Sequence, residues 1–416
     1  MGYGHQRTAD NLKGLAFNGI INSNSYDDIP RNDRNIWERS RKFYEAISNL
    51  KRIPLFGEFS FFVFDQFQKI FNFYPKRDLS AASFSLNQIY SLLKKGWGRH
   101  LVAKIGVQPL PLLATFFPPA LMAEFFDYPG EIFCVVCDAD ISRNWAARNA
   151  RKSRIKYFAP TERVAERLKL YGVPSKNIFY TGYPLPSRNI GDNGEIVKKD
   201  LALRILNLDP KGRYRQRYKI LIEKFLGVLP EKTDHPLTIL FSVGGAGAQK
   251  EIGMKIIKNL SSEIKKGKTK VVLSAGIKEN IKDYFVEKIG TLGMKDFVGR
   301  GIEIIYSPEI GDYFKRFNDC LRKTDILWTK PSELSFYSAL GIPIIVSPPI
   351  GSQEEFNRRW LLKSGFGLSQ ESPDYIRHWL FDWLDCGYLA EAAMEGLVEG
   401  KRMAVRDIEK IIFKKE

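Results

Sequence analysis

Residues 325–357 decide how the chain folds, and they read DILWTKPSELSFYSALGIPIIVSPPIGSQEEFN. A short apolar strand leads into a polar turn, a short helix and a second apolar strand at 342–346. A strand–helix–strand unit predicts a parallel sheet, whose ligands bind beyond the carboxyl ends of the strands. Polar residues fall at both of those ends: Ser332 and Glu333 at the start of the helix, and Gln353, Glu354 and Asn357 in the loop after the second strand.

These polar residues predict a site for an anion and a sugar. Free N–H groups at the start of the helix near Ser332 favour an anion. The amide and carboxylate groups of Gln353, Glu354 and Asn357 can hydrogen-bond the hydroxyl groups of a sugar.

A second signal for phosphate binding opens the same half of the chain. The apolar run 237–243 leads directly into Gly244, Gly245 and Gly247, and a helix follows through Ile257. Glycines let the backbone approach a diphosphate, and the following helix presents unpaired N–H groups to it. The loop matches neither the dinucleotide fingerprint nor a Walker loop. A tight turn with a purely structural role is the alternative.

Together these stretches resemble the donor site of GT-B glycosyltransferases. The family members most similar to it are the monogalactosyl- and glucosyl-diacylglycerol synthases and the peptidoglycan N-acetylglucosaminyltransferase that acts on a lipid-linked acceptor. The matching positions are Lys330, Pro331, Gly341, Pro343, Gln353, Glu354 and Asn357. The family's two turn glycines are replaced by Ser332 and Glu333. Its ribose-binding glutamate falls on Phe336, which leaves Glu333 as the candidate substitute. The resemblance also implies a contact to the nucleotide base near Ile310.

The N-terminus carries a second part of the resemblance. The opening MGYGHQRTADNL predicts a glycine-rich turn that runs into a helix, with no strand before it. Either the sequence starts late relative to the natural gene, or the sheet has lost a strand. Gly2, Gly4, His5 and Ala9 match the family's loop, which places Gly4 on the acceptor side and makes His5 a candidate base or donor-phosphate contact. A solvent-exposed tail histidine is the alternative.

Residues 133–184 resemble the glycolipid synthases throughout. Runs 101–117 and 132–136 are predicted as buried parallel strands, and the second ends at Asp138 and Asp140. Asp138 could hold the acceptor hydroxyl, orient His5 or cap a local turn. Trp145, which follows shortly, is assigned to the acceptor side. The Asp-x-Asp spelling lies in the acceptor half, and we interpret it as coincidence rather than as a metal site.

Composition limits the class of protein. A chain of 416 residues is longer than a single hydrophobic core usually supports, so two domains are expected. Its content of 44% hydrophobic residues indicates a globular fold. No apolar run reaches the length of a membrane span and no signal peptide opens the chain, which predicts a cytoplasmic protein. Cys134 and Cys137 share an apolar strand without a second pair, which favours buried thiols over zinc.

The formal net charge of +17 predicts either an anionic partner or an ordinary soluble basic surface. Nucleic acid is excluded as a partner because no binding motif occurs and the lysines are spread along helices. Residues 53–74 are rich in phenylalanine and predict a buried helix. The alternative is an aromatic face for an anionic membrane, rimmed by Lys51, Arg52, Lys69, Lys76 and Arg77.

The predicted fold is α/β of the GT-B type, with two Rossmann-like domains whose parallel sheets face each other across a cleft. Residues 1–186 form the acceptor-side domain and residues 187–235 a linker with a helical insertion. Residues 236–385 form the nucleotide-sugar domain, and the helices of 386–416 return to the first domain.

The resemblance implies transfer of a sugar from a nucleotide-diphosphate sugar, expected to be UDP-linked, to an acceptor hydroxyl on a lipid or glycan. His5 or Asp138 takes the acceptor's proton, and the loop at 244–247 stabilises the departing diphosphate in place of a metal. Neither a metal nor a cofactor is therefore expected. The alternatives are a nucleotide-sugar 2-epimerase of the same fold and a catalytically silent relative that binds nucleotide sugar. A peripheral position on the inner face of the membrane is a second prediction for its location.

Overall fold

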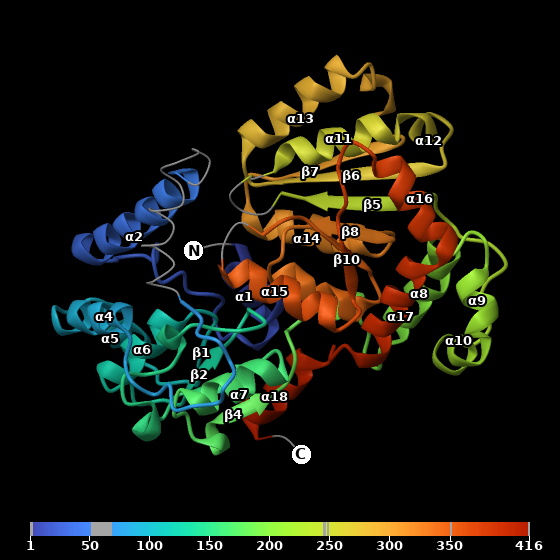
Figure 1. Ribbon diagram of the computed structural model, residues 1–416. Helices are drawn as coiled ribbons and strands as arrows, with labels where there is room; N and C mark the ends of the chain where they lie inside the picture. The colour runs from blue at the N-terminus through green and yellow to red at the C-terminus, as the bar shows by residue number, and fades with distance from the viewer. Residues whose placement is uncertain (1–2, 51–68, 244–246, 248, 350–351, 415–416) are drawn as a thin grey trace.

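The computed structural model describes residues 3–50, 69–243, 247, 249–349 and 352–414. Over these residues the chain forms two parallel sheets flanked by helices, one sheet in each half of the sequence (Figure 1). This is the GT-B architecture, so the predicted fold class is confirmed. The aromatic run predicted as a helix or membrane face lies outside the described residues between 53 and 68.

The N-terminal half is built on a four-stranded sheet in the order β1-β2-β3-β4, with every pair parallel. Helix α6 packs on β1 and β2, and α7 packs on β3 and β4. Among the described residues before β1 there is no strand, and the chain enters at helix α1. The strands are Leu112–Ala114, Ile132–Val135, Lys156–Ala159 and Ile178–Tyr180; the helices are α1 Tyr3–Asn11, α2 Arg31–Leu50, α4 Phe84–Lys94, α5 Arg99–Gly106, α6 Phe117–Phe125 and α7 Glu162–Leu170.

The prediction of one strand over 101–117 is wrong for its first part, which is helix α5, and for its last residue, which begins α6. Leu101 and Val102 are buried, whereas Lys104 on the opposite side of the helix is exposed. With Ile105 one turn further on, the apolar residues follow the period of a helix rather than the alternation of a strand.

The C-terminal half contains a six-stranded parallel sheet in the order β10-β9-β8-β5-β6-β7. The strand order reverses between β5 and β8, which is the switch point where doubly wound sheets bind their ligands. The strands are β5 Leu237–Ser242, β6 Thr269–Gly276, β7 Ile302–Tyr306, β8 Ile326–Thr329, β9 Ile344–Val346 and β10 Gly367–Ser369; the helices are α11 Lys250–Asn259, α12 Ser261–Lys265, α13 Glu279–Thr291, α14 Ile310–Leu321, η7 Glu333–Leu340, α15 Ser352–Lys363, α16 Ile376–Cys386 and α17 Tyr388–Glu399.

The segment between the two sheets contains three helices, α8 Glu195–Leu208, α9 Arg213–Arg217 and α10 Lys219–Leu226. Arg204 ties this segment to the C-terminal half, because its buried guanidinium donates to the carbonyl oxygens of Thr324 at 2.6 Å and Gly341 at 2.9 Å. Short 3-10 turns occur at η1 Lys13–Leu15, η2 Arg143–Trp145, η3 Ala150–Lys152, η4 Ser175–Asn177, η5 Ser187–Asn189 and η6 Lys295–Phe297.

The chain returns to the N-terminal half later than the prediction for 386–416 states. Helix α17 packs on η7 and α8, and so stays with the C-terminal half and the linker. Only α18, Ala404–Phe413, reaches the first sheet, where Ile408 and Ile412 join a buried cluster with Phe133 and Phe158. The returning helix thus covers the face of the N-terminal sheet opposite α6.

Candidate active site at the domain interface

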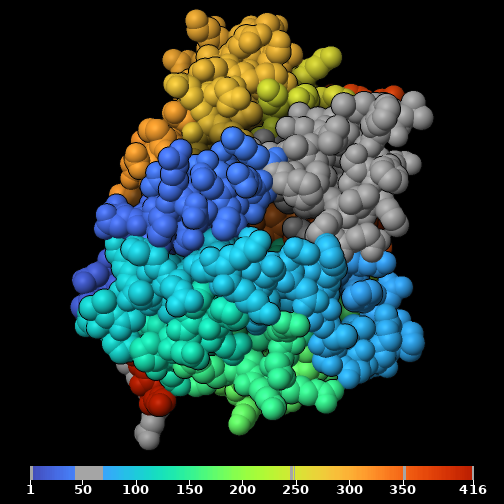
Figure 2. Space-filling view, turned by 90° about the vertical axis from the view of Figure 1, so that its left-hand side faces the viewer, coloured from blue at the N-terminus to red at the C-terminus, as the bar shows by residue number. Residues whose placement is uncertain are grey.

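Helix α1 lies between the two halves (Figure 1), and α2 lies over their boundary on the face in Figure 2. On one side the Tyr3 hydroxyl accepts a hydrogen bond from the backbone N–H of Ile277, at 3.1 Å. On the other side the Thr8 hydroxyl donates to Tyr183, at 3.0 Å, and the Asn11 amide donates to the Pro184 carbonyl, at 2.9 Å. Tyr3, Gly4 and His5, which are predicted in a loop, instead form the first turn of this helix.

The His5 imidazole is held in one tautomer. Its Nδ1 lies 2.8 Å from the Thr115 carbonyl oxygen, which can only accept, so Nδ1 carries the proton and Nε2 keeps a free lone pair. The Thr115 hydroxyl in turn donates a hydrogen bond to the His5 carbonyl oxygen, at 2.9 Å. Burial lowers the pKa of His5 to about 4, so the ring is neutral at neutral pH.

Trp145 lies in the N-terminal half, on the side where it is predicted, but it is only 2% exposed. Its ring centre lies 5.4 Å from that of Phe117 and 6.0 Å from that of His5, so it packs against His5. Gly4, which is predicted on the acceptor side, faces the C-terminal half instead, because a Cβ atom there would lie 3.0 Å from a carboxylate oxygen of Glu333. A large aromatic residue after a strand packs into the core more often than it meets a ligand.

Asp138 lies at the interface and contacts the C-terminal half directly. The Asn357 side chain donates to its carboxylate at 3.2 Å and accepts from the Ala139 backbone N–H at 2.7 Å. Burial raises the pKa of Asp138 to about 6; Asn357 opposes the shift, and the carboxylates of Glu333 and Glu354 add to it. A carboxyl group with this pKa is well matched to proton transfer near neutral pH.

The Gln-Glu-x-x-Asn residues were predicted in a loop, but they form the first turns of helix α15. Gln353 and Asn357 are four residues apart and therefore share one face of the helix. Glu354 pairs with Lys330 at 2.5 Å, which joins the end of β8 to the start of α15. The acidic residues 354 and 355 in the first turn, directly after a proline- and glycine-rich stretch, are the signal that could have predicted the helix.

The predicted ribose contact Glu333 is engaged by the N-terminal half. Its carboxylate lies 3.4 Å from the Nε of Arg7 on helix α1, and both side chains are buried. Phe336, which stands where the family has its glutamate, stacks on Tyr183 at 5.0 Å and packs on Trp360 at 4.8 Å. Phe336 thus belongs to an aromatic cluster with Tyr183 and Trp360, at the position where the family that this sequence resembles has its ribose-binding glutamate.

The remaining donor residues follow strands at the carboxyl edge of the C-terminal sheet. Gly247 adopts a φ of +69°, and the side chain of Gln249 donates to the Pro348 carbonyl at 3.0 Å, so the loop after β5 meets the loop after β9. Ser332 caps η7 by accepting from the Leu334 N–H, and Ile310 begins helix α14. Gly244 and Gly245 lie outside the described residues.

Asp140 forms a buried ion pair with Arg167. Its carboxylate accepts two hydrogen bonds from the Arg167 guanidinium, both at 2.8 Å, and both side chains are buried. Among the described residues, no group of three or more His, Cys, Asp and Glu side chains is arranged to hold a metal ion. Cys134 and Cys137 are buried free thiols, and burial raises the pKa of each.

We expect the pH dependence of turnover to separate the two candidate bases. If the Asp138 carboxylate accepts the proton, kcat/KM is constant near pH 7 and falls about tenfold per pH unit below about pH 6, as the carboxylate is protonated. If His5 accepts it, the fall occurs only near pH 4. A kcat/KM profile between pH 4 and 8 checks this, and a profile without a limb near pH 6 would contradict the role of Asp138.

Comparison with known proteins gives a family model and a curated relative that are similar to this chain. The family model described as Domain of unknown function (DUF6938) matches residues 230–358, which include strand β5 and Asn357. The processive diacylglycerol beta-glucosyltransferase of Bacillus subtilis (strain 168) is 22% identical over 264 residues. The match covers 62% of this chain and 56% of that relative, just over half its length. The resemblance to diacylglycerol glycosyltransferases is thereby confirmed.

Three solved structures match this chain over most of its length at low sequence identity. MurG from Acinetobacter baumannii is 14% identical, with a TM-score of 0.45 over 89% of this chain and 95% of that one. A putative UDP-N-acetylglucosamine 2-epimerase from Listeria monocytogenes is 15% identical, with a TM-score of 0.46 over 81% and 82% of the two chains. The complex of MnaA from S. aureus with UDP is 12% identical, with a TM-score of 0.48 over 78% and 81%.

Proposed function

We propose that this protein transfers a sugar from a nucleotide-diphosphate sugar, with UDP as the nucleotide, to the hydroxyl group of a lipid or glycan acceptor. One observation carries the proposal. Asn357 lies on the helix after strand β9 of the C-terminal sheet, and it hydrogen-bonds Asp138, which lies just after strand β2 of the N-terminal sheet. A side chain expected to bind the sugar thus touches one expected to receive the acceptor's proton. The similarity to a diacylglycerol glucosyltransferase supports the same class of reaction.

In the proposed reaction the acceptor hydroxyl attacks the anomeric carbon while Asp138 takes its proton. The bond between the anomeric carbon and the diphosphate breaks, and the diphosphate leaves with the electron pair. Backbone N–H groups after β5 and at the start of α11 stabilise its growing negative charge without a metal. The neutral His5 ring offers its Nε2 lone pair as a second acceptor, which can orient the attacking hydroxyl.

Nucleotide binding tests the donor site. We expect UDP to raise the melting temperature more than UMP, with or without magnesium, and to stabilise by about 2.7 kcal/mol at a hundred times its Kd. Gly247→Ala should weaken this effect, because the added Cβ would lie 2.7 Å from Ile281. Gly293→Ala is the matched control, since that glycine has a similar φ and open space around it. If no nucleotide stabilises the protein, the donor site is refuted.

A nucleotide-sugar 2-epimerase is the second candidate function. It is favoured by the carboxyl group of Asp138, whose pKa is raised to about 6 by burial and, to a lesser extent, by the charges of Glu333 and Glu354. A carboxyl group with a pKa raised toward neutral suits removal and return of a carbon-bound proton. Incubation with UDP-N-acetylglucosamine in deuterated water separates the two: an epimerase incorporates deuterium at C2 of the sugar, and a transferase does not.

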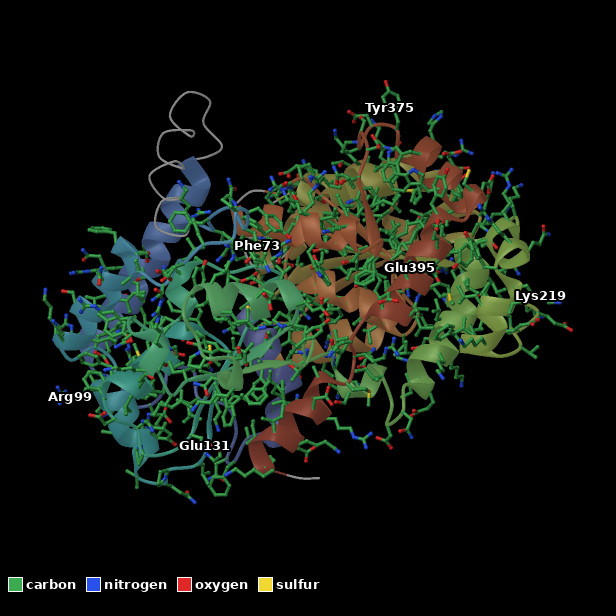
Figure 3. The ribbon with its side chains drawn as sticks, turned by 60° about the horizontal axis from the view of Figure 1, so that its bottom comes forward. Phe73, Arg99, Glu131, Lys219, Tyr375 and Glu395 are labelled. Carbon is green, nitrogen blue, oxygen red and sulfur yellow. The ribbon has the colours of Figure 1, made fainter. Side chains whose placement is uncertain are left out.

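We also propose a peripheral association with anionic membranes. None of the described helices is long and apolar enough to cross a bilayer. In the segment after residue 68, Tyr74 is 68% exposed and lies beside the exposed cations Lys76 and Arg77. The ring centre of Phe73, which Figure 3 labels, lies 3.9 Å from the guanidinium carbon of Arg163. Aromatic side chains with a basic rim suit the membrane interface.

Vesicle sedimentation tests this association. We expect the protein to pellet with vesicles containing phosphatidylglycerol at low salt and to be released at high salt, because salt screens exposed charges beyond about 10 Å at 0.1 M. Arg77→Glu should weaken binding. Lys219→Glu is the control, since Lys219 lies at the far end of the molecule (Figure 3). Absence from the pellet at low salt would refute the association.

A further inference from the structure

We propose that Arg7 is a positioning residue: together with Glu333 it fixes helix α1 onto the donor half, so that the proton-accepting side chains keep one register with the bound sugar. The role rests on the proposed function, because it assumes that Asp138 and His5 act on an acceptor at this interface. Arg7 itself is buried and need not touch a substrate.

Arg7 reaches from the N-terminal helix into an aromatic socket of the donor half. Its guanidinium carbon lies 4.3 Å from the ring centre of Phe317 and 4.6 Å from that of Phe314. One Nη also lies 3.3 Å from the Tyr313 hydroxyl, and the side chain is 1% exposed. A planar guanidinium stacks well on aromatic faces, and the attraction grows when water is excluded. These contacts anchor α1 to helix α14.

Glu333 supplies the counter-charge that a buried guanidinium requires. Its Oε1 lies 3.4 Å from the Arg7 Nε, and its other oxygen lies against Gly4 on the same helix. Breaking a buried ion pair by removing one partner leaves an uncompensated charge. The lack of a side chain at Gly4 permits the close approach, because a Cβ atom would be 3.0 Å from the carboxylate.

The same helix is fastened to the acceptor half two residues before Arg7. His5 and Thr115 exchange two hydrogen bonds, of 2.8 and 2.9 Å, directly after strand β1. Helix α1 therefore connects the two sheets over a few residues, and the contact between Asn357 and Asp138 is a second connection. A displacement of about 1 Å between reacting groups can reduce turnover about 100-fold, so the register of the two halves bears directly on rate.

Kinetics of Arg7→Met test the role. We expect kcat to fall about 10- to 100-fold, with the KM for the nucleotide sugar changed less than about threefold, because the donor contacts lie within one half. In an Asp138→Asn background Arg7→Met should cost nothing further, since it acts through that side chain. The control is Lys13→Met, which removes an exposed cation just after α1 and should leave turnover unchanged. Equal losses in both backgrounds, or a raised KM alone, would overturn the proposal.

A measurement of the distance between the two halves tests the role of Arg7 without an activity assay, and it uses two variants rather than one. Spin labels at Arg99→Cys and Lys288→Cys, with Cys320 and Cys386 replaced by serine, report the separation of the halves. We expect a narrow distribution in the parent and a broader one with Glu333→Gln, which keeps the shape of the side chain, or with Arg7→Met. If the parent turns over no nucleotide sugar, the proposed function fails while these distances still decide the role of Arg7. An unchanged distribution in both variants would overturn it.

Discussion

Replacing Asp138 with asparagine is expected to lower kcat by about 10²- to 10⁴-fold, the usual contribution of a positioned general base. Asparagine keeps the oxygen that accepts the hydrogen bond from Asn357, so the contact between the two halves is retained. Only the ability to take a proton is removed. The melting temperature and the affinity for UDP should therefore stay close to those of the parent, and steady-state kinetics with isothermal titration of UDP measures both effects.

The control for Asp138→Asn is Asp374→Asn, which changes a carboxylate that pairs with Lys255 at the surface of the donor half. It should leave kcat unchanged. If Asp138→Asn keeps most of the parent's turnover, the general base is another side chain, and His5→Ala becomes the decisive variant. If both variants keep their turnover, neither residue acts as the base.

The largest loss of stability is expected from Asp140→Ala, about 3–5 kcal/mol in the free energy of unfolding. The Arg167 side chain is fully buried, and the substitution removes the carboxylate that pairs with its guanidinium. A buried charge without a counter-ion is far more costly than the loss of a pair in water. Urea denaturation followed by far-ultraviolet circular dichroism gives the difference.

Glu166→Ala provides the comparison for the buried pair, because Glu166 pairs with Lys169 at 2.6 Å while 41% of its side chain is exposed. Exposed pairs contribute about 0–1 kcal/mol, so this variant should be close to the parent. If Asp140→Ala destabilises no more than Glu166→Ala, the buried pair does not support the loop that carries Asp138.

The features that the sequence predicts well are those encoded locally. Apolar runs followed by Gly or Pro turns identify β5, β8 and β9 and place their carboxyl ends, so the positions of Gly247, Ser332 and Asn357 at one edge of a sheet follow from pattern alone. The helical start at 352–357 is not predicted, because the proline- and glycine-rich stretch just before it favours a loop. The acidic first turn that follows it is a weaker signal.

The features that could not be predicted depend on contacts between distant residues. Nothing near Arg7 in the sequence indicates that its partner is Glu333, more than three hundred positions away. Asp138 and Asp140 likewise follow the same predicted strand, and nothing near them in the sequence indicates that Arg167 on α7 pairs with Asp140. The environment of a side chain, rather than its type, decides its role, and that environment forms only when residues distant in the sequence pack together.

A crystal structure with UDP tests the central claim most directly. We expect the diphosphate to lie against the backbone after β5 and at the start of α11. Its terminal phosphate, to which the donor sugar would be attached, should point toward Gln353 and Asn357. UDP bound instead in the groove of about 620 Å³ beside α14, lined by Thr238, Lys270 and Arg316, would contradict it. Crystals grown with saturating UDP that hold no nucleotide between the two halves would contradict it equally.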